Sequence, residues 1–217
     1  MRRNELLVCG IASSLIYVIA DVLGALRWEG YSYTGQAISE LSAIGAPSRQ
    51  LVAPLFLCYT LLALVFGLAV WNRTGGKGGL RVAGGMLIAI GLVDLLAPFF
   101  PMHLRGSEIT WTDTMHKILT GVTVVLIVLA IGFAATAFGK TFRLYSTATI
   151  LILLTFGALG GRYAPQVEAG LATPWLGVVE RICVFSYLLW QAVLAVQLLR
   201  PLFFHSPALP PRRNAAS

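Results

Sequence analysis

GLVDLLAPFFPMHLRGSEITWTDTMHK, residues 91–117, joins an apolar run that contains Asp94 to a polar loop that contains His103 and His116. Two prolines separate the run from the loop, and proline interrupts a helix. An ionisable side chain inside an apolar run is costly in a bilayer, and such residues usually mark the functional part of a membrane protein. We therefore expect the functional site to lie where this apolar segment ends.

The composition of the whole chain indicates a membrane protein. Of the 217 residues, 57% are hydrophobic and 12% are charged, and the mean hydropathy is +0.79. This leaves too little polar surface for a soluble domain, so we predict an all-α polytopic protein that lies in a lipid bilayer. The net charge of +7 comes from bases that stand singly or in pairs between the apolar runs, where they set topology. No nucleic-acid partner is therefore expected.

Six apolar runs have the length and composition to cross a bilayer as helices. The first is interpreted as a membrane helix rather than a signal peptide, because it lacks a small-x-small cleavage site. The tail, rich in proline and small polar residues, is predicted to be disordered and cytoplasmic. The predicted spans are residues 6–26, 51–71, 81–99, 117–138, 145–160 and 176–199, in one transmembrane domain (1–200) followed by the tail (201–217).

The basic residues predict the orientation of the bundle. Most of them fall on one side of a six-span arrangement, and the side richer in Lys and Arg is normally the cytoplasm. This group is Arg2, Arg3, Arg73, Lys77, Arg81, Lys140, Arg143, Arg200, Arg212 and Arg213. Both termini are therefore predicted to be cytoplasmic, with the chain in the inner (plasma) membrane. Nearly all acidic residues fall on the opposite side, so the polar pocket is expected to face outward.

The predicted pocket draws on four helices and on the loop after the third. Helical spacing places Asp21, Asp94, His116 and Glu180 at similar depths, near the outer ends of their spans. Nearby arginines are expected to neutralise some of these carboxylates, because unpaired charges there are costly. The full predicted lining is Asp21, Asp94, His103, His116, Arg162, Glu180, Arg181 and Tyr187. The expected ligand is a lipid or another small molecule, which the protein binds or transports.

The same residue types allow an enzymatic alternative. His103, His116 and Asp94 are ligand types of a zinc site that keeps one position open for water. Glu40 or Glu180 would then be the general base, which makes His116, Asp94 and Glu40 the candidate catalytic residues. The set resembles in residue type the Asp/His sites of seven-helix ceramidase-like hydrolases, which implies a metal-dependent hydrolase of a lipid or isoprenoid headgroup. The sequence contains neither an HExxH nor a GxSxG motif.

Two further interpretations remain open. The charges could form only an interhelical ion-pair network, in a transporter, a receptor or an accessory subunit. A haem could instead be held by two histidines, although His103 and His116 share one side of the membrane and His205 lies on the other. His116 is also expected to open the fourth helix, where the helix dipole favours a neutral imidazole.

One segment resembles a known family. ISELSAIGAPSR (residues 38–49), together with Asp94 late in the third span and His116 at the start of the fourth, is similar to the DUF998 family of bacterial and archaeal membrane proteins. A short surface helix is predicted at residues 36–44, with Glu40 turned toward the mouth of the bundle. The resemblance covers most of the chain and implies six helices, but it assigns no activity. The loop that contains His103 is longer and more polar than is typical of the family.

Overall fold

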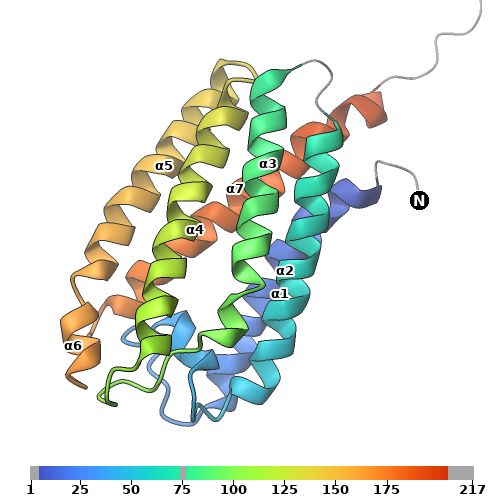
Figure 1. Ribbon diagram of the computed structural model, residues 1–217. Helices are drawn as coiled ribbons and strands as arrows, with labels where there is room; N and C mark the ends of the chain where they lie inside the picture. Colours follow the sequence, from blue (N-terminus) through green and yellow to red (C-terminus); the bar gives the residue numbers. More distant parts are fainter. Residues whose placement is uncertain (1–4, 74–76, 205–217) are drawn as a thin grey trace, which may run out of the picture.

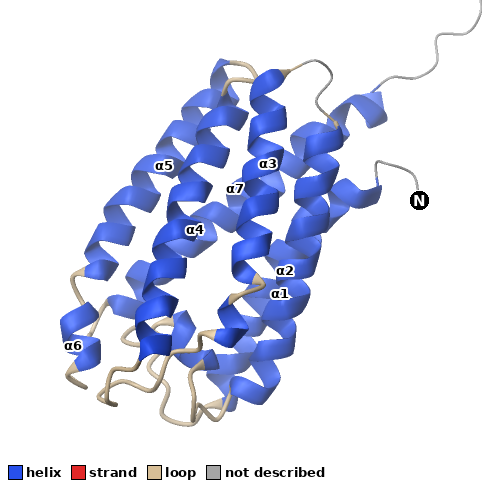
Figure 2. Cartoon of the chain, in the orientation of Figure 1, coloured by secondary structure: helices blue, strands red, loops and turns tan. Residues whose placement is uncertain are grey.

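The computed structural model describes residues 5–73 and 77–204, and of residues 201–204 it describes only the backbone. This part of the chain is helical, with a single isolated bridge between Ile44 and His103 (Figure 2). The six long helices are α1 (Glu5–Arg27), α2 (Arg49–Asn72), α3 (Gly78–Asp94), α4 (Trp111–Ala135), α5 (Lys140–Gly161) and α7 (Leu176–Phe204). Three short helices lie in the connections: η1 (Ile38–Ser42), η2 (Ala97–Phe99) and α6 (Ala164–Glu168).

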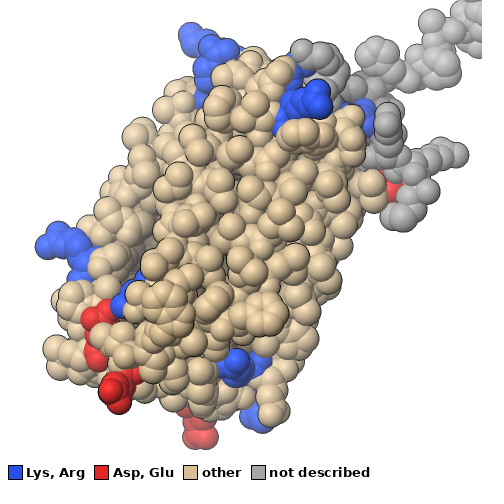
Figure 3. All heavy atoms as spheres, in the orientation of Figure 1, with Lys and Arg blue, Asp and Glu red and all other residues tan. Residues whose placement is uncertain are grey.

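The predicted six-span architecture is confirmed. Within the described residues, six helical segments are long and apolar enough to cross a membrane. On the face shown in Figure 3, charged side chains lie toward the two ends of the molecule, and a broad band between them is free of charge. Such a band matches the hydrocarbon region of a bilayer, where charged side chains are costly. The protein is therefore a multi-pass membrane protein.

The long helices form a closed ring (Figure 1). Following the chain, α1 packs on α2, α2 on α3, α3 on α4, α4 on α5 and α5 on α7, and α7 closes the ring against α1. The end of α2 and the start of α3 lie at one end of the ring, as does the short connection between α4 and α5. The other end, which we call the loop end, carries η1, η2 and α6. Large side chains from several helices, including Phe66, Ile131 and Trp190, are fully buried within the ring.

Glycine allows a close helix contact between α2 and α3. A methyl group added at Gly84 would lie 2.5 Å from the backbone nitrogen of Trp71, and one added at Gly67 would lie 2.9 Å from that of Ile88. The two backbones therefore approach each other where a side chain is absent. Small residues are the usual basis of such packing in membranes, where lipid is as apolar as the helices themselves.

Several helix ends differ from the predicted ones, among them the start of α5, which begins at Lys140 rather than at residue 145. Helix α4 begins at Trp111 rather than at residue 117, because the Asp113 carboxylate accepts a hydrogen bond from the Thr110 N–H (2.9 Å) and caps an extra turn and a half. His116 therefore lies inside the helix and does not open it. Helix α3 ends at Asp94, before the prolines. Helix α7 continues to Phe204, so residues 201–204 of the predicted disordered tail are helical; residues 205–217 lie outside the described residues.

Candidate functional site

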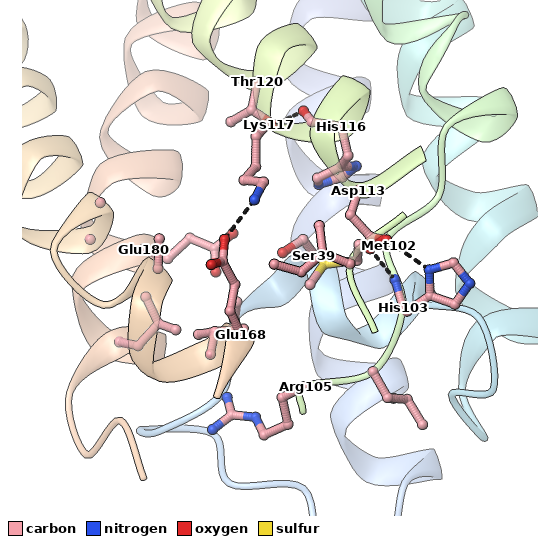
Figure 4. A pocket seen from close by; sticks show the side chains of 18 of the residues that line it. Ser39, Met102, His103, Arg105, Asp113, His116, Lys117, Thr120, Glu168 and Glu180 are labelled. Atoms are coloured by element: carbon pink, nitrogen blue, oxygen red, sulfur yellow. Dashed lines mark hydrogen bonds and ion pairs between the residues drawn. The ribbon is translucent and has the colours of Figure 1, made fainter. Parts of the chain in front are cut away.

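A cavity of about 400 Å³ lies at the loop end, between α4, α5 and α7. The segment after η2, residues 102–109, lies across it together with parts of η1 and α6. The helices contribute His116, Lys117, Thr120 and Val124 from α4, Phe156, Gly157, Gly160 and Gly161 from α5, and Leu176, Glu180, Cys183 and Val184 from α7. The cavity thus has an apolar wall along the helices and polar side chains near its mouth (Figure 4).

Glycines on α5 make room for the cavity. A methyl group added at Gly161 would meet no atom within 4 Å, and one added at Gly157 would have only the Cys183 sulfur in contact, at 3.9 Å. At Gly160 the nearest atom would be a methyl carbon of Val179, at 3.6 Å. A larger residue at these positions would therefore extend into the empty space rather than into a neighbouring helix.

An arginine from the loop closes one side of the cavity. The Arg105 guanidinium donates to both carboxylate oxygens of Glu40, at 2.8 Å from Nε and 2.5 Å from Nη2. Glu40 is fully buried on η1, and its hydrogen bond with Arg105 raises the pKa of the guanidinium. Arg105 also donates to the Thr173 hydroxyl (3.1 Å). The pair therefore connects three separate loop-end segments and keeps both charges in place.

Two more pairs lie along the mouth of the cavity (Figure 4). Lys117 on α4 donates to Glu168 on α6 at 2.6 Å. His103 Nδ1 lies 2.9 Å from Asp113 Oδ2, and the His103 backbone N–H donates to Asp113 Oδ1 at 2.7 Å. Asp113 therefore holds the loop against the first turn of α4. Each of these four side chains therefore already has a partner.

Three acidic or imidazole side chains of the lining form no ion pair among the described residues: Glu108, His116 and Glu180. Glu108 is exposed on the loop. Glu180, on α7, accepts a hydrogen bond from the Ile38 backbone N–H at 2.7 Å. His116 faces the cavity from α4 and interacts with the backbone of Phe100. On the helical wall, the Glu180 carboxylate and the His116 imidazole are therefore open to a ligand without the loss of an ion pair.

A buried ion pair anchors the ring next to this site. Arg181 on α7 donates to Asp21 on α1 through Nη2 (2.8 Å) and Nε (3.0 Å). The Tyr33 hydroxyl donates to the same carboxylate at 2.6 Å, and the Tyr31 hydroxyl accepts from Arg181 at 2.9 Å. Burial raises the pKa of both tyrosines, so each hydroxyl keeps its proton. The network joins the first and last long helices but does not line the cavity.

The structure brings only part of the predicted set together. His103, His116 and Glu180 line the cavity. The other predicted lining residues lie elsewhere: Asp21 and Arg181 pair with each other, Asp94 accepts from Thr123 (3.3 Å), Tyr187 donates to Gln191 (3.0 Å), and Arg162 is exposed at the end of α5. Arg181 does neutralise one of the predicted carboxylates, Asp21, but away from the cavity. Glu40 is paired with Arg105 and does not face the cavity.

The predicted zinc set is not assembled. Within residues 5–73 and 77–204, no group of three or more His, Cys, Asp or Glu side chains could hold a metal ion. His103 contacts Asp113, and Asp94 accepts a hydrogen bond from Thr123 on α4. The residues present therefore do not fit a zinc ion, because a catalytic site needs three protein ligands at one point.

Several residues of the site were not predicted. Arg105, the Lys117–Glu168 pair, Cys183 and the glycine face of α5 all contribute to it. The spacing of Gly157, Gly160 and Gly161 along one helix face is a signal in the sequence that predicts close packing, yet the structure shows open space beside it.

Fold and cavity together define a six-helix membrane protein with a largely apolar cavity at one end. The family described as protein of unknown function (DUF998) matches residues 11–197, and the chain belongs to this family. No curated protein and no solved structure matches the chain.

Proposed function

We propose that this protein binds an amphipathic small molecule or a lipid in the cavity between α4, α5 and α7. The observation that carries the proposal is the cavity itself, whose volume of about 400 Å³ falls within the range of small-molecule sites. Its helical wall is apolar, with Val124, Phe156 and Val184, and its polar groups gather at the loop end. A molecule with an apolar body and a polar end would match both parts.

The apolar wall would supply most of the binding free energy. Each methylene group that moves from water into such a site contributes about 0.8 kcal/mol. The polar groups at the mouth would fix the orientation, with the apolar body of the ligand along the helices and its polar end near His116 and Glu180. The same arrangement would suit a carrier that takes up its ligand from one leaflet.

The loop end is proposed to face away from the cytoplasm. The opposite end, where α2 ends and α3 and α5 begin, carries several basic residues of the described chain: Arg73, Lys77, Arg81, Lys140 and Arg143. Short connections rich in Lys and Arg normally stay cytoplasmic. The cavity would then open toward the outer surface of the plasma membrane.

The positions of the candidate catalytic residues do not support a metal-dependent hydrolase. Of its candidate catalytic residues, His116 lines the cavity, whereas Asp94 and Glu40 are bonded to Thr123 and Arg105. Binding without chemistry accounts for the cavity and for the ion pairs around it.

A pair of glycine variants tests the proposal. Dodecanol would be titrated by calorimetry into the full chain, held in a non-ionic amphipol so that no detergent competes. We expect saturable binding to the native protein and a loss of roughly tenfold or more in Gly157→Leu, because that side chain would fill the cavity.

The matched control is Gly121→Leu, an exposed position on α4 where an added methyl group meets no atom within 4 Å. It should bind dodecanol as the native protein does. Equal binding by the native protein and Gly157→Leu would show that the cavity is not the site, and absence of saturable binding to the native protein would refute the function.

A further inference from the structure

We infer that the polar end of the ligand carries a positive charge and pairs with Glu180, so that the ligand class is an amphipathic amine or ammonium compound. This inference rests on the proposed function and adds the charge of the ligand to it. It follows from which charged groups line the cavity, which of them are already paired, and where the half-buried carboxylate without an ion pair lies.

Carboxylates outnumber the permanently charged bases along the lining. The lining includes the four acids Glu108, Asp113, Glu168 and Glu180, the two bases Arg105 and Lys117, and the imidazoles of His103 and His116. The surplus produces a negative potential in a cleft whose walls are apolar, and such walls concentrate the field within the cleft. A cationic ligand is therefore favoured over an anionic one.

The two permanently charged bases of the lining, Arg105 and Lys117, are both already paired with a carboxylate. Arg105 holds the buried Glu40 with two hydrogen bonds of 2.8 and 2.5 Å, and Lys117 lies 2.6 Å from Glu168. A ligand with a phosphate or carboxylate would have to compete with these carboxylates for Arg105 or Lys117. Breaking the pair of Arg105 and Glu40 would leave Glu40 buried without a counter-charge, which is strongly unfavourable.

Glu180 is the half-buried carboxylate of the lining that has no base within ion-pair distance among the described residues. The neighbouring Arg181 is turned away and held by Asp21, with contacts of 2.8 and 3.0 Å. The Ile38 backbone N–H donates to one carboxylate oxygen of Glu180 at 2.7 Å and fixes its direction. Figure 4 shows Glu180 on the wall formed by α7, across the cavity from His116 and Lys117 on α4.

The position of Glu180 also sets the depth of the charge. Glu180 lies one turn into α7, and Cys183 and Val184 continue the lining on the next turn. A cationic group at Glu180 would therefore leave its apolar chain beside Val184 and Phe156. A charge-assisted hydrogen bond in this half-buried setting is stronger than an ion pair on an open surface.

Three ligands with one apolar chain and different charges test the inference. Dodecylamine, dodecanol and dodecanoate would each be titrated into the full chain in a non-ionic amphipol at neutral pH. We expect dodecylamine to bind about tenfold more tightly than dodecanol, and dodecanoate to bind most weakly. In Glu180→Gln the affinity for dodecylamine should fall to that for dodecanol, while the affinity for dodecanol stays unchanged.

Glu29→Gln is the matched control, because it removes the same charge from an exposed loop-end position outside the cavity. It should keep the preference for the amine. If dodecanol binds but the amine is not preferred, or if Glu180→Gln keeps the preference, the inference is overturned and the proposed function stands. If none of the three ligands binds saturably, the proposed function itself fails. If a variant does not fold, the affinities of the native protein for the three ligands still test whether a positive charge is preferred.

Discussion

Replacing Asp21 by asparagine should be among the most destabilising single changes in this protein. Asp21 is fully buried, and the side chain of its partner Arg181 is 6% exposed. The substitution keeps the size of the side chain but leaves the guanidinium, which makes contacts of 2.8 and 3.0 Å to the carboxylate, without a counter-charge. Removing one partner of a buried ion pair costs about 3–5 kcal/mol in the free energy of unfolding.

The comparison that isolates this effect is Glu168→Gln, which is the same chemical change in an exposed pair. The side chains of Lys117 and Glu168 are 48% and 36% exposed. Water screens such a pair, so the cost should be at most about 1 kcal/mol. The structure thus predicts a difference of at least about 2 kcal/mol between two carboxylate-to-amide changes at the same end of the molecule.

Both variants would be unfolded reversibly in mixed micelles, with helix content followed by circular dichroism. A double-mutant cycle with Arg181→Met adds a second readout, because loss of the guanidinium should cost much less once Asp21 is already an amide. Equal destabilisation by the Asp21 and Glu168 substitutions would refute the reasoning. Additive effects of Asp21→Asn and Arg181→Met would also refute it, since they would mean that Asp21 and Arg181 do not interact.

Three further results are expected. Asp94→Asn should change the free energy of unfolding by less than about 1 kcal/mol, because the one hydrogen bond described for Asp94 is a 3.3 Å contact from Thr123; a loss as large as that of Asp21→Asn in the same assay would disprove this. Burial raises the pKa of Tyr31, so the unfolded chain loses that proton first and stability should fall as pH rises above about 10; Tyr31→Phe should flatten this alkaline decline in unfolding experiments. In intact cells a membrane-impermeant maleimide should label Glu29→Cys but not Lys140→Cys, and the reverse pattern would invert the proposed topology.

The sequence predicts the membrane spans well for a physical reason. A helix that crosses a bilayer requires about 20 consecutive, mainly apolar residues. Each apolar run of the sequence shows this feature by itself, without information about its neighbours. The ends of the helices are harder to predict, because they depend on local hydrogen bonds. The start of α4 at Trp111 depends on the bond between Thr110 and Asp113, in a stretch whose polar composition resembles a loop.

The site was only partly predictable, since contacts between distant segments leave no periodic pattern. Asp21 and Asp94 look alike in the sequence, as single acids inside apolar runs. In the structure one is held by Arg181 and the other by a threonine hydroxyl. The partner of Glu40 is Arg105, a loop residue 65 positions later, and no spacing rule connects them.

The cavity depends on the side chains that glycine lacks. Glycine on a membrane helix usually predicts close packing, and Gly84 on α3 fulfils that expectation against Trp71. Gly157 and Gly161 on α5 have the same local sequence character but border open space. Whether a glycine brings two helices together or leaves a hollow depends on the neighbouring helices, which the sequence alone does not place.

Photolabelling tests most directly whether the cavity is a binding site. A dodecanol that carries a diazirine on its chain would be activated in nanodiscs that contain the full protein, and the labelled residues would be mapped by mass spectrometry. We predict labelling at Phe156 and Val184 that excess dodecanol suppresses, while labelling of the exposed Leu151 and Leu154 on α5 is not suppressed. Labelling confined to the exposed residues, or equal at both places and insensitive to competition, would contradict the proposal that this protein binds an amphipathic ligand between α4, α5 and α7.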